Sequence, residues 1–276
     1  MSSKEIKHYT VDEILTYLDC SLCHHIKYKL KLKPPEEILT SQKNIFFKES
    51  IHLAVAYYYQ QLQQDNVPEL KSLYNKFYKA WLYKTDTKED ASILTRDLEN
   101  SGHIDRRNES NYITKGYKWL QQFYQYNSEI EQSIIASNYS YELVFGDSII
   151  DGEIPLIREV EVKGRKEIQL VLFSLSQKNL NQQSIKNNFT NMLHAFAFQQ
   201  LLKIHPDRIV SYQFNKSEET NVSFSTNDYK RLLNILESFF ESVDNIKPYP
   251  TTSVHTYSTL YKNLCDNYNY TINPLN

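Results

Sequence analysis

Apolar side chains in the first half of the chain recur every three or four residues, which is the spacing of amphipathic helices. The pattern predicts three long helices, over residues 44–64, 68–83 and 112–126. A shorter apolar stripe follows Thr10, which can cap a helix together with Glu13. The polar stretch 84–111 predicts a connection that holds a short helix at 93–99. We therefore expect residues 1–130 to be mainly helical.

The spacing changes after residue 131. Alternating or continuous β-branched and aromatic residues predict strands at 134–145, 148–161 and 166–175. Gly146-Asp147 and Lys163-Gly164 are the expected turns between them. A buried helix at 185–203, a strand pair at 208–215 and 219–225, and a last helix should follow. That last helix is capped by Thr226 or Asn227 and runs to about residue 245.

This order of elements predicts an α/β protein of mixed α+β type. We expect a central mixed sheet of about five strands flanked by helices. The chain reads as one domain over 1–276. Its parts are the helical segment 1–130, the sheet core with its helices at 131–245, and an irregular tail at 246–276.

Composition narrows the class of protein. The 276 residues carry 31 Lys+Arg and 33 Asp+Glu, a net charge of −2, which excludes a wholly basic nucleic-acid binder. Five glycines make a phosphate-binding Gly-rich loop unexpected. No apolar run approaches the roughly 20 residues of a membrane span, and no secretory signal is visible. Three cysteines, an odd number, favour a reducing, cytoplasmic compartment.

Four short segments resemble motifs of one nuclease superfamily. Thr10 to Cys20 is similar to an "S-x-x-x-L-x-x-Y-x-x-C" start, and Phe47 to His52 to a "G-T-x-x-H" helix. Glu142 with Ile150 to Ile157 is similar to "E…G-x-I-D-x-I", and the strand that begins at Gln169 to "I-V-D-x-K-T". Together they resemble the PD-(D/E)XK superfamily in its RecB-like branch, which includes CRISPR-adaptation nucleases and iron–sulfur exonucleases. The resemblance implies a restriction-endonuclease-like core.

The same resemblance implies a catalytic site that this chain has largely lost. In the family two carboxylates hold Mg²⁺ or Mn²⁺, the ion activates water, and a lysine assists. Here Pro155 takes the place of the first aspartate, Leu172 and Ser174 that of "D-x-K", and Met192 that of a glutamine. The histidine and glutamate places are kept by His52 and Glu142. We expect a degenerate nuclease.

The cysteines that bind an iron–sulfur cluster in relatives of this branch are also incomplete. Cys20 matches the first and Cys265 the last, while the other two places fall near His255 and Ser258. Two thiolates cannot hold a four-ligand cluster. We therefore expect no iron–sulfur cluster and no other cofactor, with Mg²⁺ required only if the chain is active.

A relocated active site is the first alternative. Asp151 and Glu161-Val-Lys163 spell D…E-x-K, and with His52 and Glu142 they would make a divergent Mg²⁺-dependent DNA nuclease. Lys163-Gly164 is the expected hairpin tip, however. This favours Glu161 and Lys163 as residues of a surface turn.

Cys20-Ser-Leu-Cys23-His24 offers two metal interpretations. The string matches C-x-x-C-H haem attachment, and it also gives half of a zinc site from Cys20, Cys23 and either His24 or His25. Cys265 and His255 could complete that zinc site. The interpretation that we favour from the sequence is a buried Cys20 at a helix end, with no metal.

Lysine alternates with apolar residues just before Pro34. The lysines are Lys27, Lys29, Lys31 and Lys33. They form either the solvated face of an amphipathic segment or a strip that contacts phosphates, and the sequence leaves both open.

The function expected from these observations is that of a pseudo-nuclease. It would act as a subunit of recombination, mobile-element, phage or defence machinery. Its expected partner is a nucleic acid, DNA rather than RNA, or another protein. We expect no membrane partner. Net charge near zero makes a protein partner at least as plausible as autonomous DNA binding. The alternatives are an active Mg²⁺-dependent DNA nuclease and a purely structural interaction protein.

Overall fold

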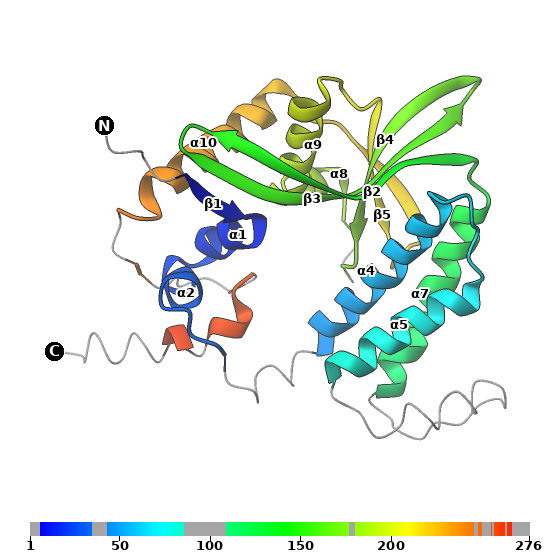
Figure 1. Ribbon diagram of the computed structural model, residues 1–276, viewed down its shortest axis with the longest axis horizontal. Helices are drawn as coiled ribbons and strands as arrows, with labels where there is room; N and C mark the ends of the chain where they lie inside the picture. Colours follow the sequence, from blue (N-terminus) through cyan, green and yellow to red (C-terminus); the bar gives the residue numbers. More distant parts are fainter. Residues whose placement is uncertain are drawn as a thin grey trace.

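The computed structural model of the protein describes residues 6–34, 43–85, 109–176, 180–245, 248–249, 255, 257–262 and 264–266. In these residues the chain forms a mixed six-stranded sheet flanked by helices (Figure 1). The expected mixed α/β class is confirmed. No helix in the described ranges is both long enough and apolar enough to cross a membrane.

The core of the sheet is an antiparallel meander. It consists of β2 (Gln132–Phe145), β3 (Ser148–Val162) and β4 (Arg165–Ser174). The strands are joined at Gly146-Asp147 and Lys163-Gly164, as the sequence predicts. Lys163 and Gly164 have φ of 54° and 76°, the positive values that a tight two-residue hairpin turn needs.

Three shorter strands complete the sheet: β5 (Arg208–Gln213) parallel to β4, β6 (Glu218–Val222) antiparallel to β5, and β1 (Lys7–Thr10) parallel to β3. The sequence did not predict β1, which has only four residues. β2 occupies one edge of β3 along most of its length. The other edge is therefore shared, by β1 at residues 148–151 and by β4 at 156–162.

Three long helices form a layer on one face of the sheet (Figure 1). They are α4 (Lys43–Leu62), α5 (Leu70–Thr85) and α7 (Glu109–Ser128). Their apolar faces bury Phe77, Trp81 and Phe123 against Val171 and Val210 of the sheet. All three were predicted within a few residues. The short helix expected at 93–99 lies outside the described residues.

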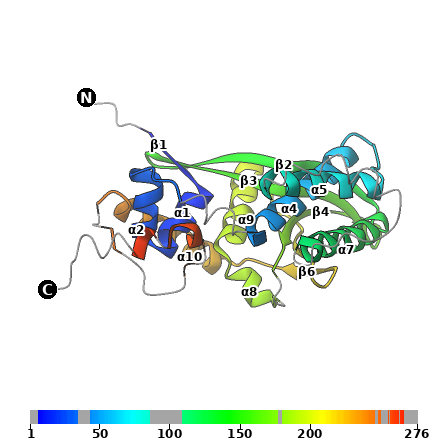
Figure 2. The ribbon, with the colours of Figure 1, turned by 90° about the horizontal axis from the view of Figure 1, so that it is seen from below.

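The opposite face of the sheet is covered by α1 (Val11–Asp19), α9 (Phe189–Leu202) and α10 (Thr226–Ser242). Figure 2 shows α9 and α10 beneath β2 and β3. Thr10 caps α1 as predicted, because its side chain accepts a hydrogen bond from the Glu13 amide at 3.1 Å. Short turns complete the chain: α2 (Ser21–His24), the π-helical turn η1 (His25–Lys29), α8 (Gln182–Lys186) and the 3₁₀ turn η3 (Thr259–Tyr261).

Two helix boundaries differ from the sequence prediction. The single helix expected at 185–203 is two helices, because Asn188 ends the first segment and caps α9 through the Asn191 amide. The apolar periodicity of α9 conceals this break. The last helix is capped by Ser225 rather than by Thr226 or Asn227, in a reciprocal capping box with Asp228.

Pro155 marks a change of face within β3. In a regular strand residues two apart share a face, but Ile154 packs on the α9 side and Leu156 on the α4 side. Directly across the ladder, Asn138 of β2 has a φ of 54°. A proline without an amide hydrogen fits this irregular point of the ladder.

A buried ion pair lies beneath the helical layer. Arg158 of β3 is 2% exposed, and its guanidinium donates to both carboxylate oxygens of Glu219, at 2.7 and 2.9 Å. It also donates to the side-chain oxygens of Gln169 and Gln132. Removing one partner of a buried pair leaves an uncompensated charge, which costs far more than breaking an exposed pair.

We expect Glu219→Ala to lower the free energy of unfolding by about 3 kcal/mol, because it strands the Arg158 charge in the core. The control is Glu159→Ala, since Glu159 pairs with the exposed Lys166 and should cost less than about 1 kcal/mol. Urea unfolding midpoints measure both. Equal losses in the two variants would show that the buried pair contributes no more to the free energy of unfolding than the exposed pair.

Candidate metal centre

Four metal-binding side chains from the two ends of the chain meet in one buried cluster. Cys20 follows α1, Cys23 lies in α2, and His255 and Cys265 come from the C-terminal segment. Their ligand atoms all lie within 4.8 Å of one another, and all four residues are buried. The Sγ atoms of Cys20 and Cys265 are 3.6 Å apart, although the two residues are 245 positions apart in sequence.

Backbone and side-chain hydrogen bonds hold the C-terminal segment against the first helices. The Asp19 carboxylate, at the end of α1, accepts from the amides of Tyr257 and Ser258 and from the Ser258 hydroxyl. Two residues further on, Ser21 exchanges hydrogen bonds with the backbone of Tyr249. These contacts flank Cys20 on both sides. They place His255 and Cys265 beside it.

The imidazole of this cluster is not satisfied by the described residues. Neither ring nitrogen of His255 has a hydrogen-bond partner among the described residues, although the residue is only 3% exposed. A buried polar atom without a partner is costly and calls for an explanation. The Sγ of Cys20 accepts from the Cys23 amide at 3.4 Å, an arrangement that stabilises charge on sulfur. A cation at the centre would satisfy the imidazole and the three sulfurs together.

The thiols hold their protons tightly in the metal-free chain. Hydrogen bonding to Cys20 raises the pKa of Cys265 to about 12, with burial adding to the effect. The Cys20 and Cys265 thiols likewise raise the pKa of Cys23 well above its ordinary value. Three crowded, buried sulfurs cannot carry negative charge without a cation beside them. A bound metal ion would supply that charge and displace the protons.

The donor set fits a single tetrahedral zinc ion. Three thiolates and one imidazole are a common structural zinc set, and Zn–S bonds of about 2.3 Å place neighbouring sulfurs about 3.8 Å apart. The observed 3.6 Å between Cys20 and Cys265 is close to that value. Mg²⁺ requires oxygen ligands, which the cluster lacks.

An iron–sulfur cluster of the kind that the family resemblance implies does not fit these residues. Each ligand of a four-iron cluster binds a different iron, which separates the ligand atoms more widely than one ion does. Here all four donor atoms lie within 4.8 Å of one another. Ser258, near one cysteine place of the family, instead donates its hydroxyl to Asp19.

The sequence analysis favoured Cys20 as a buried cysteine with no metal, whereas the structure assembles the complete zinc alternative. Cys20 is indeed buried, but it lies among three further donors. His24 and His25 are outside the set, since His24 bonds to Glu13 at 3.1 Å. His24 is therefore engaged elsewhere, which removes the support for a C-x-x-C-H haem site. His255 could be found only by its chemistry, since nothing in its local pattern marks it.

The positions that the sequence analysis compared with polar residues of the nuclease motifs do not form a polar pocket. Leu172 and Met192 are buried in the same apolar cluster, on the α9 side of the sheet. Ser174 and Pro155 are half-buried. His52 is exposed on α4, the helix that packs on the other face. The structure therefore does not gather these residues around His52.

The residues of the relocated nuclease site are also separated. Glu142 and Asp151 face each other across the β2–β3 ladder, and Asp151 bonds to His8 at 3.2 Å. Glu161 lies ten residues further along the same strand, about 33 Å away at strand spacing. Glu161 and Lys163 are exposed at the hairpin end, as expected for a surface turn. One ion cannot bind both Asp151 and Glu161.

The basic strip is partly neutralised. Lys27 pairs with Asp12 at 2.5 Å, and Lys29 pairs with Asp244 at 2.6 Å. Lys29 and then Lys7 lower the pKa of Asp244 to about 2, so this carboxylate is charged at neutral pH. Lys31 and Lys33 are exposed. Only half of the predicted strip therefore presents unpaired charge.

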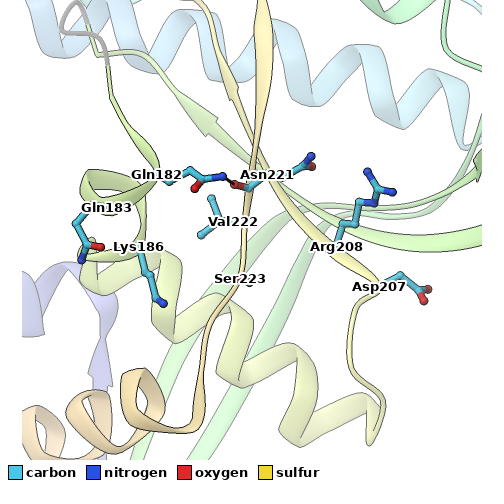
Figure 3. Close-up of a pocket in the computed structure, with 8 residues that line it drawn as sticks. All are labelled: Gln182, Gln183, Lys186, Asp207, Arg208, Asn221, Val222 and Ser223. Carbon is cyan, nitrogen blue, oxygen red and sulfur yellow. Dashed lines mark hydrogen bonds between the residues drawn. The ribbon is translucent and has the colours of Figure 1, made fainter.

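A polar cavity of about 400 Å³ lies beside α8 and the β5–β6 pair (Figure 3). Its charged groups are already engaged: Lys186 pairs with Asp228, and Arg208 pairs with Glu167. Figure 3 shows Arg208 and Asp207 turned away from Gln183 and Lys186. The cavity therefore presents no converging set of free donors.

We expect the purified protein to bind about one zinc ion per chain, measured by elemental analysis, with little iron. Cobalt substitution should give the absorption bands of a tetrahedral thiolate site. At a free zinc concentration 100-fold above Kd, binding stabilises the fold by about 2.7 kcal/mol. A chelator should therefore lower the melting temperature by about 5–10 °C.

His255→Asn should reduce the bound zinc and the chelator effect, because it removes one of the four donors. His205→Asn is the matched control, since His205 is exposed and bonds only to Gln199. Equal zinc content in both variants would exclude His255 as a ligand.

A scan against models of known protein families finds no match for the chain, and a search of curated proteins finds no similar sequence.

Proposed function

We propose that the protein is a RecB-like nuclease fold without catalysis, which acts as a binding subunit in DNA recombination, mobile-element, phage or defence machinery. The observation that carries the proposal is the apolar filling of the former metal site. Leu172 and Met192, at two of the family's polar positions, pack together in the core. Leucine offers no oxygen to a metal ion, so Leu172 cannot take over the role of the aspartate at that place in the family.

The arrangement of the sheet supports the same proposal. The antiparallel β2–β3–β4 meander is followed by α8 and α9, and then by β5 parallel to β4. The helices, the three antiparallel strands, the strand pair and the last helix follow one another in the order that the sequence predicted. Fold alone never assigns activity. The proposal of lost catalysis therefore rests on the site residues rather than on the topology.

We propose further that a zinc ion at the Cys20–Cys23–His255–Cys265 centre has a structural role. A structural zinc site has four protein ligands and leaves no open position for water or substrate. The four donors of this centre are buried and come entirely from the chain. The ion would close the C-terminal segment onto α1 and α2, and would take no part in cleavage.

The purified protein should show no cleavage of plasmid, linear duplex or single-stranded DNA in Mg²⁺ or Mn²⁺. The reason is that the separated carboxylates cannot hold the ion that activates water. Gel-based assays over a range of protein concentrations measure this, with Glu161→Ala as the comparison.

Metal-dependent cleavage by the wild type that Glu161→Ala abolishes would establish the active-nuclease alternative and overturn the proposal. Absence of cleavage together with salt-sensitive DNA binding would favour a nucleic-acid-binding subunit. Absence of both would leave a protein-binding subunit.

A further inference from the structure

The three-helix layer is strongly basic in a protein whose net charge is −2. Its helices contain eight lysines, Lys43, Lys48, Lys71, Lys76, Lys79, Lys84, Lys115 and Lys118. Against these stand two glutamates, Glu49 and Glu109. Positive charge is therefore concentrated in one structural layer, and the rest of the chain is correspondingly acidic.

Four lysines of this layer are not neutralised by ion pairs within the described residues. Among the described residues, no carboxylate lies within ion-pair distance of Lys71, Lys76, Lys79 or Lys118. Most cations of the sheet and the N-terminal segment behave differently, as Lys166 and Arg165 illustrate with partners at 2.6 and 2.9 Å. The unpaired lysines keep their full charge available for a partner.

Helix α5 presents its lysines on one exposed face. Leu73, Phe77 and Trp81 form the buried side, at helical spacing. The opposite side carries exposed Lys71, Lys76 and Lys79, with Tyr83 at its end. From Lys71 to Tyr83 the helix rises about 18 Å, which matches the rise of about five nucleotides of one strand.

Aromatic rings accompany this charge. Tyr83 is 88% exposed, so its ring is free to stack on a base. The Lys76 ammonium lies 4.7 Å from the ring centre of Tyr57 on α4, which holds that charge at the junction of the two helices. Exposed lysines beside an accessible aromatic ring are the combination that binds single-stranded nucleic acid without sequence preference.

We propose that the exposed face of α5, defined by Lys71, Lys76, Lys79 and Tyr83, binds the phosphate backbone of a nucleic acid. This surface would be the nucleic-acid-binding site of the proposed function, and the inference rests on that function. A lipid surface is disfavoured, because Tyr83 is the one large apolar side chain exposed on this face and a membrane-binding helix needs an apolar face. The basic strip at Lys27–Lys33 is a weaker site, since half of it is paired.

The test compares two triple charge reversals in the full-length, metal-loaded protein. One is Lys71→Glu/Lys76→Glu/Lys79→Glu on α5. The matched control is Lys203→Glu/Lys216→Glu/Lys230→Glu, which makes the same charge change at exposed lysines elsewhere. Circular dichroism, melting temperature and zinc content verify that both variants fold. Fluorescence anisotropy with labelled 20-nucleotide single-stranded and duplex DNA measures binding over a range of salt concentrations.

We expect the α5 variant to bind at least tenfold more weakly than the control at low salt. The slope of log K against log salt should fall by about 2–3, since each lost phosphate contact contributes about 0.7–0.9. Tyr83→Ala should weaken binding to single-stranded DNA more than to duplex DNA.

Equal weakening in the two triple variants would overturn the inference, because binding would then follow overall charge. So would wild-type binding that is as strong to polyglutamate or anionic vesicles as to DNA. If the wild type binds no nucleic acid, the inference about α5 is overturned, and only the protein-binding form of the proposed function remains. If the wild type cleaves DNA and the α5 variant loses binding, the proposed function fails while this surface stands.

Discussion

Cys20 and Cys265, from opposite ends of the chain, meet in one contact. The packing of α2 and η1 against the C-terminal segment depends on it. Helices α1 and α2 are short, with nine and four residues. The C-terminal segment supplies Tyr261 and Cys265 to their small core. Asp19 and Ser21 anchor the backbone of that segment. The three sulfurs and one imidazole gathered there could hold one metal ion, and bonds to that ion would stabilise this small core.

The sequence predicts most of the fold because its elements are long and strongly periodic. Helices α4, α5 and α7 and the β2–β3–β4 meander carry that signal, and Gly164 marks its hairpin tip. β1 escaped prediction because its pairing is entirely non-local, to the first residues of β3. For the same reason the metal centre was only an alternative in the sequence analysis, which favoured a buried Cys20 without a metal. Its donors are neighbours in space but 245 residues apart along the chain, and no periodicity links His255 to Cys20.

The two faces of the sheet have different chemistry. The α9 face is apolar, and it buries Leu172 and Met192, two of the positions that the sequence analysis compared with polar residues of the nuclease motifs. The α4 face combines a rich aromatic core with the buried Arg158–Glu219 pair, and its helices carry eight lysines against two glutamates. If the protein binds a polyanion through α5, binding would thus occur on the face of the sheet opposite to Leu172 and Met192. Such a separation is compatible with losing cleavage while keeping a partner.

Thr10 belongs to two elements at once. It is the last residue of β1, and its side chain starts α1. No flexible joint therefore separates the central sheet from the helices that hold Cys20 and Cys23. Lys7 of β1 and Lys29 of η1 both form ion pairs with Asp244, just after α10. These pairs hold β1 and η1 against the end of α10. The C-terminal residues that contact α1 and α2 are therefore connected to the edge of β3 through a continuous series of hydrogen bonds.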